Sequence, residues 1–579
     1  MNDLKELLRF VRPYRRLALF SFAMLLAMVA LDLAVPRLVE RTIDQGVRRG
    51  DMAVVLGTSA LMLALSIIEV AAAVLNSNSS VRVGESVARD LRQAVFVKIQ
   101  SFSHGNMDRF STGRLMVRLT SDTGAVQRLA QVTLRIGTRA PLTMLGAIAL
   151  MFVTSPGLAA AMVPILLVAG VCIVVFSARM EPLFRAVQQR LDRLNTVLQE
   201  NIAGARLVKA FVRSGREIAR FEATNTELAD GTTSVTQYMS LMTPMLTVLI
   251  NLGMVLVIWM GGNRVIQGRL SLGQIVAFTN YLLATLNPLV MMTQLSNTWA
   301  NGMASARRVN EVLDAESAVP PASPGSASLA ASGPCSVAFL GVSFSYGPGL
   351  AALEEVSLSA EPGQTVAILG STGAGKSSLV NLIPRFYDVD RGQVLVGGID
   401  VREIREDSLR ARVAVVPQES VLFSGTVRDN IRYGRPEATE GEVVAAAQAA
   451  QAHDFILRLP QGYDTRVEER GVNLSGGQKQ RISIARALAA KPGVLVLDDS
   501  TSAVDVETET RIQTALPAAL GACTVFVVAQ RISTVLNADK IVVLEQGRVV
   551  AEGRHRELLG SSPIYREIYD SQLGGGPRE

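Results

Sequence analysis

Six apolar stretches, each about 20 residues long, lie in the first half of the chain and restrict its fold more than any other feature. They cover residues 17–36, 53–75, 132–154, 158–177, 240–261 and 272–295. A helix of about 20 residues is about 30 Å long, which matches the hydrocarbon core of a bilayer. The chain is therefore expected to begin with an all-α transmembrane domain of six helices, assigned to residues 1–313. Because Arg135 and Arg139 interrupt the third stretch, its start is the least defined.

Two long charged segments, residues 76–131 and 178–239, separate these stretches and are rich in Arg and Lys. Basic residues gather on the cytosolic side of membrane proteins, so both segments and the N-terminus are predicted to be cytosolic. The same distribution explains the net charge of +6 without a nucleic-acid partner. No proline separates the second stretch from residue 102, which predicts one helix of about 50 residues. Patches at 110–116 and 204–215 are expected to present short contact helices, with tips near 111–116 and 211–215.

A change of composition follows the membrane domain. Residues 314–334 are rich in Pro, Ser, Ala and Gly, which is typical of a linker. Short β-branched runs then alternate with helical stretches, at 365–369, 413–416, 494–497, 524–528 and 541–544. This alternation predicts an α/β P-loop nucleotide-binding domain with a parallel sheet over residues 335–573, followed by a tail at 574–579.

The loop after the first β-branched run has the pattern that binds phosphates. It consists of Gly370, Ser371, Thr372, Gly373, Ala374, Gly375, Lys376 and Ser377, and Ser378 follows. Glycines let backbone N–H groups close around phosphate oxygens, the lysine reaches the terminal phosphates, and the Ser377 hydroxyl suits Mg²⁺. The run 494–497 leads to Asp498, an acidic residue that can hold the water shell of the metal. The two motifs together predict a site for ATP and Mg²⁺.

Between these motifs lie Leu474, Ser475, Gly476, Gly477 and Gln478, and here the sequence resembles the ATP-binding cassette (ABC) family, whose signature motif this is. The resemblance covers essentially the whole chain and implies an exporter half-transporter of the bacterial inner membrane. It implies that Tyr346 stacks on adenine and that Gln418, with Ser377 and Asp498, contacts the magnesium. It also implies a dimer, because ATP in this family lies between the P-loop of one cassette and the signature of the other.

Two positions in the predicted catalytic site depart from the family pattern. After Asp498 the family has a glutamate that orients and deprotonates the attacking water, whereas this chain has Asp499, which is one methylene shorter. A misplacement of about 1 Å can cost about a hundredfold in rate. The switch histidine is replaced by Gln530, which carries neither a titrating proton nor a positive charge. This pair of changes resembles the degenerate-site subunit of heterodimeric bacterial ABC multidrug exporters.

The favoured hypothesis is ATP-driven export of lipophilic or amphipathic compounds by one half of a heterodimer. Asp499 and Gln530 would then belong to a site that holds ATP, while the signature motif would complete the catalytic site of the partner. Three alternatives are a slow homodimeric exporter, an ATP-gated regulator or channel, and an importer of similar architecture. The expected partners are a second half-transporter, membrane lipid and a lipophilic small molecule, without nucleic acid.

Four polar residues stand inside the apolar stretches, namely Asp32, Glu69, Asn251 and Asn280. Ionisable and polar groups within a membrane are functional by default, so these residues could line a translocation path. Contacts between helices or at the membrane interface explain Asp32 and Glu69 equally well. No substrate follows from these residues alone.

Overall fold

A computed structural model of the protein describes residues 9–320, 326–330, 332–347, 349 and 351–573, without the side chains of Ser533, Leu573 and some residues between 286 and 297. Two compact units are present: one contains Met1–Gln100 and Thr112–Ala315, and the other contains Ser101–Ser111 and Glu316–Glu579. The predicted tail at 574–579 lies outside the described residues, as do residues 321–325 and 331 of the predicted linker.

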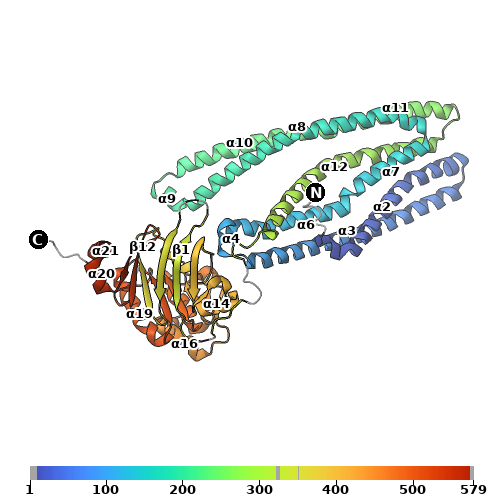
Figure 1. Ribbon diagram of the computed structural model, residues 1–579. Helices are drawn as coiled ribbons and strands as arrows, with labels where there is room; N and C mark the ends of the chain where they lie inside the picture. The colour runs from blue at the N-terminus through green and yellow to red at the C-terminus, as the bar shows by residue number, and fades with distance from the viewer. Residues whose placement is uncertain (1–8, 321–325, 331, 348, 350, 574–579) are drawn as a thin grey trace. The chain divides into compact units, whose positions relative to one another are not determined.

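The first unit is built from helices. The longer ones are α2 (Arg15–Arg41), α3 (Met52–Gln100), α6 (Thr123–Val132), α7 (Arg139–Thr154), α8 (Pro156–Ala203), α10 (Ser214–Ser240), α11 (Met242–Ile266) and α12 (Leu272–Leu313). Short helical segments join them, namely η1 (Arg12–Tyr14), η2 (Thr42–Gly46), η3 (Val47–Arg49), α5 (Thr112–Val117), η4 (Arg118–Asp122), η5 (Thr133–Gly137) and α9 (Ala205–Ala210). Figure 1 shows α2 packed along α3 and α8 packed along α10.

Among the described residues, five helical stretches are long and apolar enough to cross a membrane: Arg9–Arg49, Met52–Gln100, Thr112–Thr154, Pro156–Ala203 and Ser214–Ile266. They contain five of the six predicted spans. The sixth, residues 272–295, falls in α12, part of whose side chains lie outside the described residues, so this span stays a prediction. Helix α3 has 49 residues, which confirms the predicted helix of about 50. The third span begins irregularly, because the π-helical turn η5 and Thr138 precede α7.

The second unit contains two main sheets. The strands are β1 (Val337–Phe344), β2 (Leu353–Ala360), β3 (Thr365–Leu369), β4 (Arg391–Val396), β5 (Ile399–Asp400), β6 (Val413–Val416), β7 (Gly425–Thr426), β8 (Arg466–Val467), β9 (Val494–Asp498), β10 (Thr524–Val528), β11 (Lys540–Glu545) and β12 (Arg548–Gly553). Strands β11, β3, β10, β9 and β6 pair in parallel in one sheet, with β12 antiparallel at its edge. The predicted β-branched runs all lie in this sheet, so the parallel α/β prediction is confirmed. The antiparallel sheet β2-β1-β4-β5 was not predicted.

Helices of the second unit surround these sheets. They are α4 (His104–Arg109), α13 (Lys376–Asn381), α14 (Glu406–Arg412), α15 (Val427–Arg432), α16 (Glu440–Ala449), α17 (His453–Leu457), α18 (Gly476–Ala489), α19 (Val506–Leu520), α20 (His555–Ser561) and α21 (Pro563–Leu573). Four 3₁₀ turns lie between them, namely η6 (Val401–Glu403), η7 (Gly462–Asp464), η8 (Glu469–Gly471) and η9 (Ile532–Thr534).

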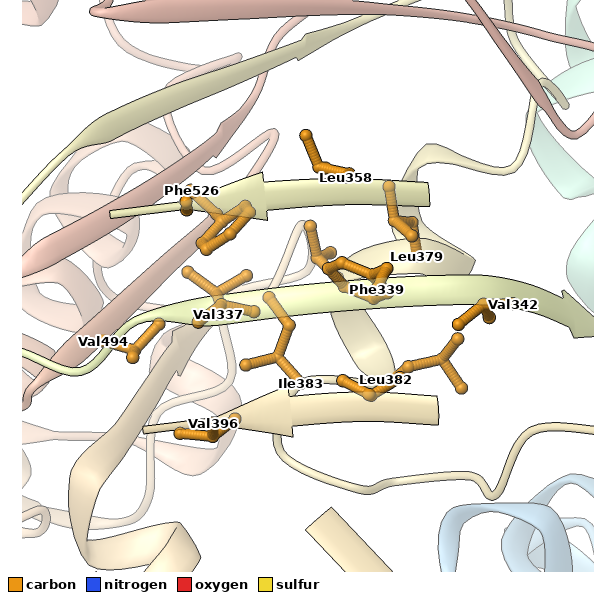
Figure 2. Close-up of a cluster of buried hydrophobic side chains, with 14 of the residues drawn as sticks. Val337, Phe339, Val342, Leu358, Leu379, Leu382, Ile383, Val396, Val494 and Phe526 are labelled. Carbon is orange, nitrogen blue, oxygen red and sulfur yellow. The ribbon is translucent and has the colours of Figure 1, made fainter. Parts of the chain in front are cut away.

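Helix α13, which follows the P-loop, is held by a hydrophobic cluster. Figure 2 shows Leu379 of α13 beside Phe339 of β1, with Phe526 of β10 in the same cluster. All three side chains are at most 1% exposed. Burial of one such side chain contributes roughly 1.5–3 kcal/mol to folding. The cluster therefore anchors the helix that carries Lys376 and Ser377 to both sheets.

Candidate functional site

The P-loop begins where β3 ends and turns through positions that only glycine occupies without strain. Gly370 and Gly375 have φ angles of 151° and 95°, in the region that disfavours side chains. A Cβ at Gly370 would lie 2.2 Å from the carbonyl oxygen of Leu544, and one at Gly375 would lie 2.5 Å from that of Ala352. The glycines therefore leave the backbone of the loop uncovered by side chains. Backbone N–H groups of such a loop are the donors that bind phosphate oxygens.

Lys376 lies against this loop. Its Nζ donates hydrogen bonds of 2.8 Å to the carbonyl oxygens of Gly370 and Ser371. Burial lowers the pKa of the ammonium, and the carboxylates of Asp499 and Asp498 oppose this effect. One face of the loop thus gathers a cation and two carboxylates, which is the charge pattern of a site for a phosphate with a divalent cation.

Ser377 and Asp498 approach each other at the end of β9. The Ser377 hydroxyl donates a hydrogen bond of 2.9 Å to Oδ1 of Asp498. Burial raises the pKa of Asp498, with the nearby Asp499 carboxylate adding to this effect and the Ser377 bond opposing it. Hydroxyl and carboxylate oxygens are ligands that Mg²⁺ prefers, so these two residues fit the metal that accompanies ATP.

Two other candidate side chains, Gln418 and Gln530, donate hydrogen bonds to Asp499. Gln530 Nε2 donates to its Oδ2 at 2.9 Å, and Gln418 Nε2 donates to the same oxygen at 3.3 Å. The backbone of Asp499 has a φ of 45°, and its N–H donates to the Val528 carbonyl at 3.2 Å. Burial raises the pKa of Asp499, while Lys376 and the Gln418 bond oppose it. The two departures from the family pattern are therefore in direct contact.

Gln530 is itself held from its other side. The backbone carbonyl of Gln530 accepts a 2.9 Å hydrogen bond from Nε2 of Gln572. The side-chain oxygen of Gln572 in turn accepts a 2.8 Å hydrogen bond from the backbone N–H of Ile532. A residue of the last described helix, α21, thus positions the segment that carries Gln530. Sequence analysis did not identify Gln572, because no local pattern marks a glutamine near the end of a helix as a positioning residue.

Tyr346 lies at the edge of the P-loop region. It is 57% exposed, and its hydroxyl and the Ser378 hydroxyl are 3.0 Å apart. Its ring meets the rings of Phe344 and Tyr387 edge-on, with centroids 4.8 Å and 5.2 Å away. An exposed aromatic face fixed in this way is suited to stack on a base.

The signature motif starts α18 with a complete cap. The Ser475 hydroxyl accepts a bond of 3.3 Å from the Gln478 N–H, and the Gln478 side chain accepts one of 2.9 Å from the Ser475 N–H. A Cβ at Gly477 would lie 2.9 Å from the Ala503 carbonyl oxygen, so that position requires glycine. Among the described residues, no hydrogen bond joins the signature residues to the P-loop of the same chain.

Gln480, two residues beyond the motif, joins the signature helix to the segment after Asp499. Its side chain is 5% exposed, donates to the Ser502 hydroxyl at 3.2 Å and accepts from the Ala503 N–H at 3.0 Å. Glu509 of α19 accepts bonds from Thr501 and Thr534 at 2.7 Å and 2.8 Å beside a cavity of about 160 Å³ that Asp499 and Gln530 also line. Sequence analysis missed both residues, although the position of Gln480 next to the signature was an available signal.

Helix α4 packs on the cassette close to Tyr346. The Tyr387 hydroxyl donates a 2.7 Å hydrogen bond to Asp108, and the His104 ring stacks on Phe386 with centroids 3.8 Å apart. Asn106 donates to the Glu316 carbonyl at 2.8 Å and accepts from the Ala318 N–H at 2.9 Å. Helix α4, His104–Arg109, therefore carries aromatic and polar contacts with the cassette and lies just before the predicted tip at 111–116, which stays a prediction.

Comparisons with known proteins agree with this architecture. The transmembrane region of ABC transporters matches residues 18–289, and the ABC transporter domain matches residues 353–502. An uncharacterized ABC transporter ATP-binding protein of Bacillus subtilis (strain 168), YfiB, is 39% identical over 576 residues and the match covers 99% of each protein. An ATP-dependent lipid A-core flippase of Desulfotalea psychrophila is 37% identical over 491 residues, or 85% of each protein.

A solved structure has the same fold along nearly the whole chain. It is described as a bacterial Atm1-family ABC exporter with ATP bound, and it matches with a TM-score of 0.81 and 29% identity over 97% of this chain and 99% of that chain. ABC exporters work as dimers and use ATP with Mg²⁺. The protein therefore belongs to the ABC transporter family, as an exporter of the inner membrane whose cytosolic nucleotide-binding domain makes it an ATPase and translocase.

Proposed function

We propose that the chain is one half of a heterodimeric exporter and that its own nucleotide site binds ATP with little turnover. The observation that carries this proposal is the contact between Asp499 and Gln530, whose side chains are 2.9 Å apart. An aspartate and a glutamine stand where a longer base and a histidine would act, and each supports the other's conformation. A change in one residue alone would leave the other without this partner.

The geometry supports a binding role for most of the site. The P-loop residues 370–377 with Ser378 would hold the phosphates, Tyr346 would stack on adenine, and Ser377, Gln418 and Asp498 would hold the metal. Gln418 and Gln530 both donate to Oδ2 of Asp499. Two amide donors hold the carboxylate where it lies, which would keep it short of an attacking water.

The signature motif supports a complementary role on the partner. Ser475, Gly476, Gly477 and Gln478 are all present, and the Ser475 cap is intact. In the proposed dimer this motif completes the partner's site, where a full-length base and a histidine carry out hydrolysis. Hydrolysis therefore depends on the signature of this chain more than on its own Asp499.

The substrate is proposed to be a lipophilic or amphipathic compound that moves out of the cell. One relative is named an ATP-dependent lipid A-core flippase, which supports an amphipathic substrate for a chain with a similar membrane region. The likeness to an Atm1-family ABC exporter supports the outward direction over import.

The test uses the chain reconstituted with its partner half-transporter. We expect Asp499→Asn to change the ATPase rate less than about twofold, and Ser475→Arg to lower it at least about a hundredfold, because the latter puts a bulky cation where the signature meets the γ-phosphate. Thr439→Arg is the matched control, since Thr439 caps α16 with the same capping box but lies outside the nucleotide site. A large loss of ATPase from Asp499→Asn would favour a slow homodimeric exporter over this proposal.

A further inference from the structure

A cavity of about 900 Å³ lies inside the membrane unit, between α2, α3, the η5–α7 segment and α12. This volume lies within the usual range of pockets that hold a drug-sized molecule. Asp32, Glu69 and Asn280, three of the polar residues singled out in the apolar stretches, all line it. The fourth, Asn251, is not among its lining residues.

Three charged side chains from three different helices meet in this cavity. Arg139 of α7 donates a 2.5 Å hydrogen bond to Oδ2 of Asp32 on α2, and its Nη2 lies 3.4 Å from Oε1 of Glu69 on α3. The Asp32, Glu69 and Arg139 side chains remain 32%, 23% and 37% exposed. They form an ion cluster that still faces the cavity.

The acidic and basic side chains of this cluster are unequal in number. Two carboxylates share one guanidinium, and Glu69 receives only the longer of the two contacts. A carboxyl group within the thickness of a membrane is costly to ionise unless a positive group compensates it. The Glu69 end of the cavity is therefore a position for a cationic group of a ligand.

A second guanidinium lines the same cavity. Arg135 precedes Arg139 by four positions, which is about one helical turn. Arg135 is exposed and lines the cavity. Within the part of the chain that the structure describes, Arg135 has no carboxylate within ion-pair distance, whereas Arg139 has two. The cavity thus offers a guanidinium that lies outside ion-pair distance of any described carboxylate, next to a cluster with one more carboxyl group than guanidinium.

We propose that this cavity binds the polar end of an amphipathic zwitterion, with its ammonium at Glu69 and its anionic group at Arg135. The inference rests on the proposed export function and names the substrate class of that path. Asp32 and Arg139 are positioning residues, because their short bond keeps Glu69 from receiving a full counter-charge. A lipid without charged groups would leave both Glu69 and Arg135 without a partner.

The experiment follows ATP-dependent transport in proteoliposomes that contain the chain and its partner half-transporter. The probes are three fluorescent lipids with the same tails, which carry a phosphocholine, a trimethylammonium or a phosphate head group. We expect the unmodified pair to transport the phosphocholine probe at least about fivefold faster than either single-charge probe, since only this probe satisfies both ends of the cavity.

Two variants separate the two ends. Glu69→Gln is expected to slow the phosphocholine and trimethylammonium probes about tenfold and to leave the phosphate probe unchanged. Arg135→Gln is expected to slow the phosphocholine and phosphate probes by a similar factor and to leave the trimethylammonium probe unchanged. Arg264→Gln is the matched control, because it removes a guanidinium from α11, outside the cavity lining.

The outcomes distinguish this inference from the export function. Equal transport of the three probes by the unmodified pair would overturn the zwitterion site. An equal loss of transport of all three probes in Glu69→Gln would also overturn it and would show that the ion cluster serves to hold the helices together. Failure of the unmodified pair to move any probe, with ATP hydrolysis intact, would overturn the proposed export of amphipathic compounds together with this site.

Discussion

Asp499 and Gln530 stand 31 positions apart in the chain but act as one unit in the structure. The carboxylate of Asp499 is reached by Gln530 at 2.9 Å and by Gln418 at 3.3 Å, and the Gln530 backbone is held in turn by Gln572. Neutral amides surround the position of the base, and none of them can transfer a proton near neutral pH. This arrangement is suited to keeping ATP bound.

Restoring the family residues at both positions tests this account. We expect the double variant Asp499→Glu with Gln530→His to raise the Mg²⁺-dependent ATPase of the chain purified without its partner by about a hundredfold, because a glutamate places the base about 1 Å closer to the water. The chain has an intact signature, so two copies can form complete sites. Adding Lys376→Ala to the double variant should abolish the gain, and an unchanged rate in the double variant would contradict the degenerate-site assignment.

At the scale of elements, α4 comes from the first long charged segment and packs on the cassette. Asp108 bonds to the Tyr387 hydroxyl, and the Tyr387 ring meets Tyr346 edge-on at 5.2 Å. Burial, followed by the bond to Asp108, raises the pKa of Tyr387, so its hydroxyl remains a donor at physiological pH. These contacts connect the contact helix to the proposed adenine-stacking residue through one side chain.

Tyr387→Phe removes the hydrogen bond and keeps the ring. The lost bond is expected to weaken the attachment of α4 by about 1 kcal/mol, which increases the local opening of this helix about fivefold. Hydrogen exchange of the amides at 104–109 measures this change. The matched control is Tyr433→Phe, because the Tyr433 ring stacks on Phe423 and is 61% exposed; equal exchange in both variants would show that the Asp108 bond does not hold the helix.

His104 makes the same attachment sensitive to acid. Burial, together with the positive charge of Arg410, lowers the pKa of His104, while Asp108 opposes the shift. The folded unit therefore binds fewer protons than the unfolded chain below about pH 6.5, and its free energy of unfolding falls as the pH decreases from that value toward the folded pKa. Thermal unfolding between pH 7.5 and 5 should show this loss, and His104→Phe should reduce it. An identical pH dependence in the variant would exclude His104 as its source.

At the scale of the whole molecule, one cassette does not form a complete catalytic site. Within the described residues, the signature residues of α18 make no hydrogen bond to the P-loop of their own chain. We expect the unmodified chain alone to hydrolyse ATP at less than about one hundredth of the rate of the reconstituted pair, since in the proposed heterodimer the partner would supply the effective base. Robust Mg²⁺-dependent ATPase of the chain alone would support a homodimer instead.

Much of the fold was predictable because its signals are local. Strands β3, β6 and β10 have the predicted bounds, since short β-branched runs bordered by glycine, charged and polar residues form buried parallel strands. Helix α3 ends at Gln100, close to the predicted end at 102, because its run of residues contains no proline. The antiparallel sheet was not predicted, since β1, β2 and β4 alternate buried and exposed residues less regularly and pair through register shifts.

The amino-acid sequence alone determined that this protein is a membrane helix bundle joined to an ATP-binding cassette. Apolar stretches must leave water wherever they occur, and the P-loop and signature motifs are contiguous, so neither conclusion depends on distant contacts. Only the tertiary structure decided which helix contacts the cassette, that Gln530 touches Asp499, and that Asp32, Glu69 and Arg139 share one cavity. These pairings join residues separated by 31 to 279 positions, and packing of whole elements, rather than local pattern, brings such residues together.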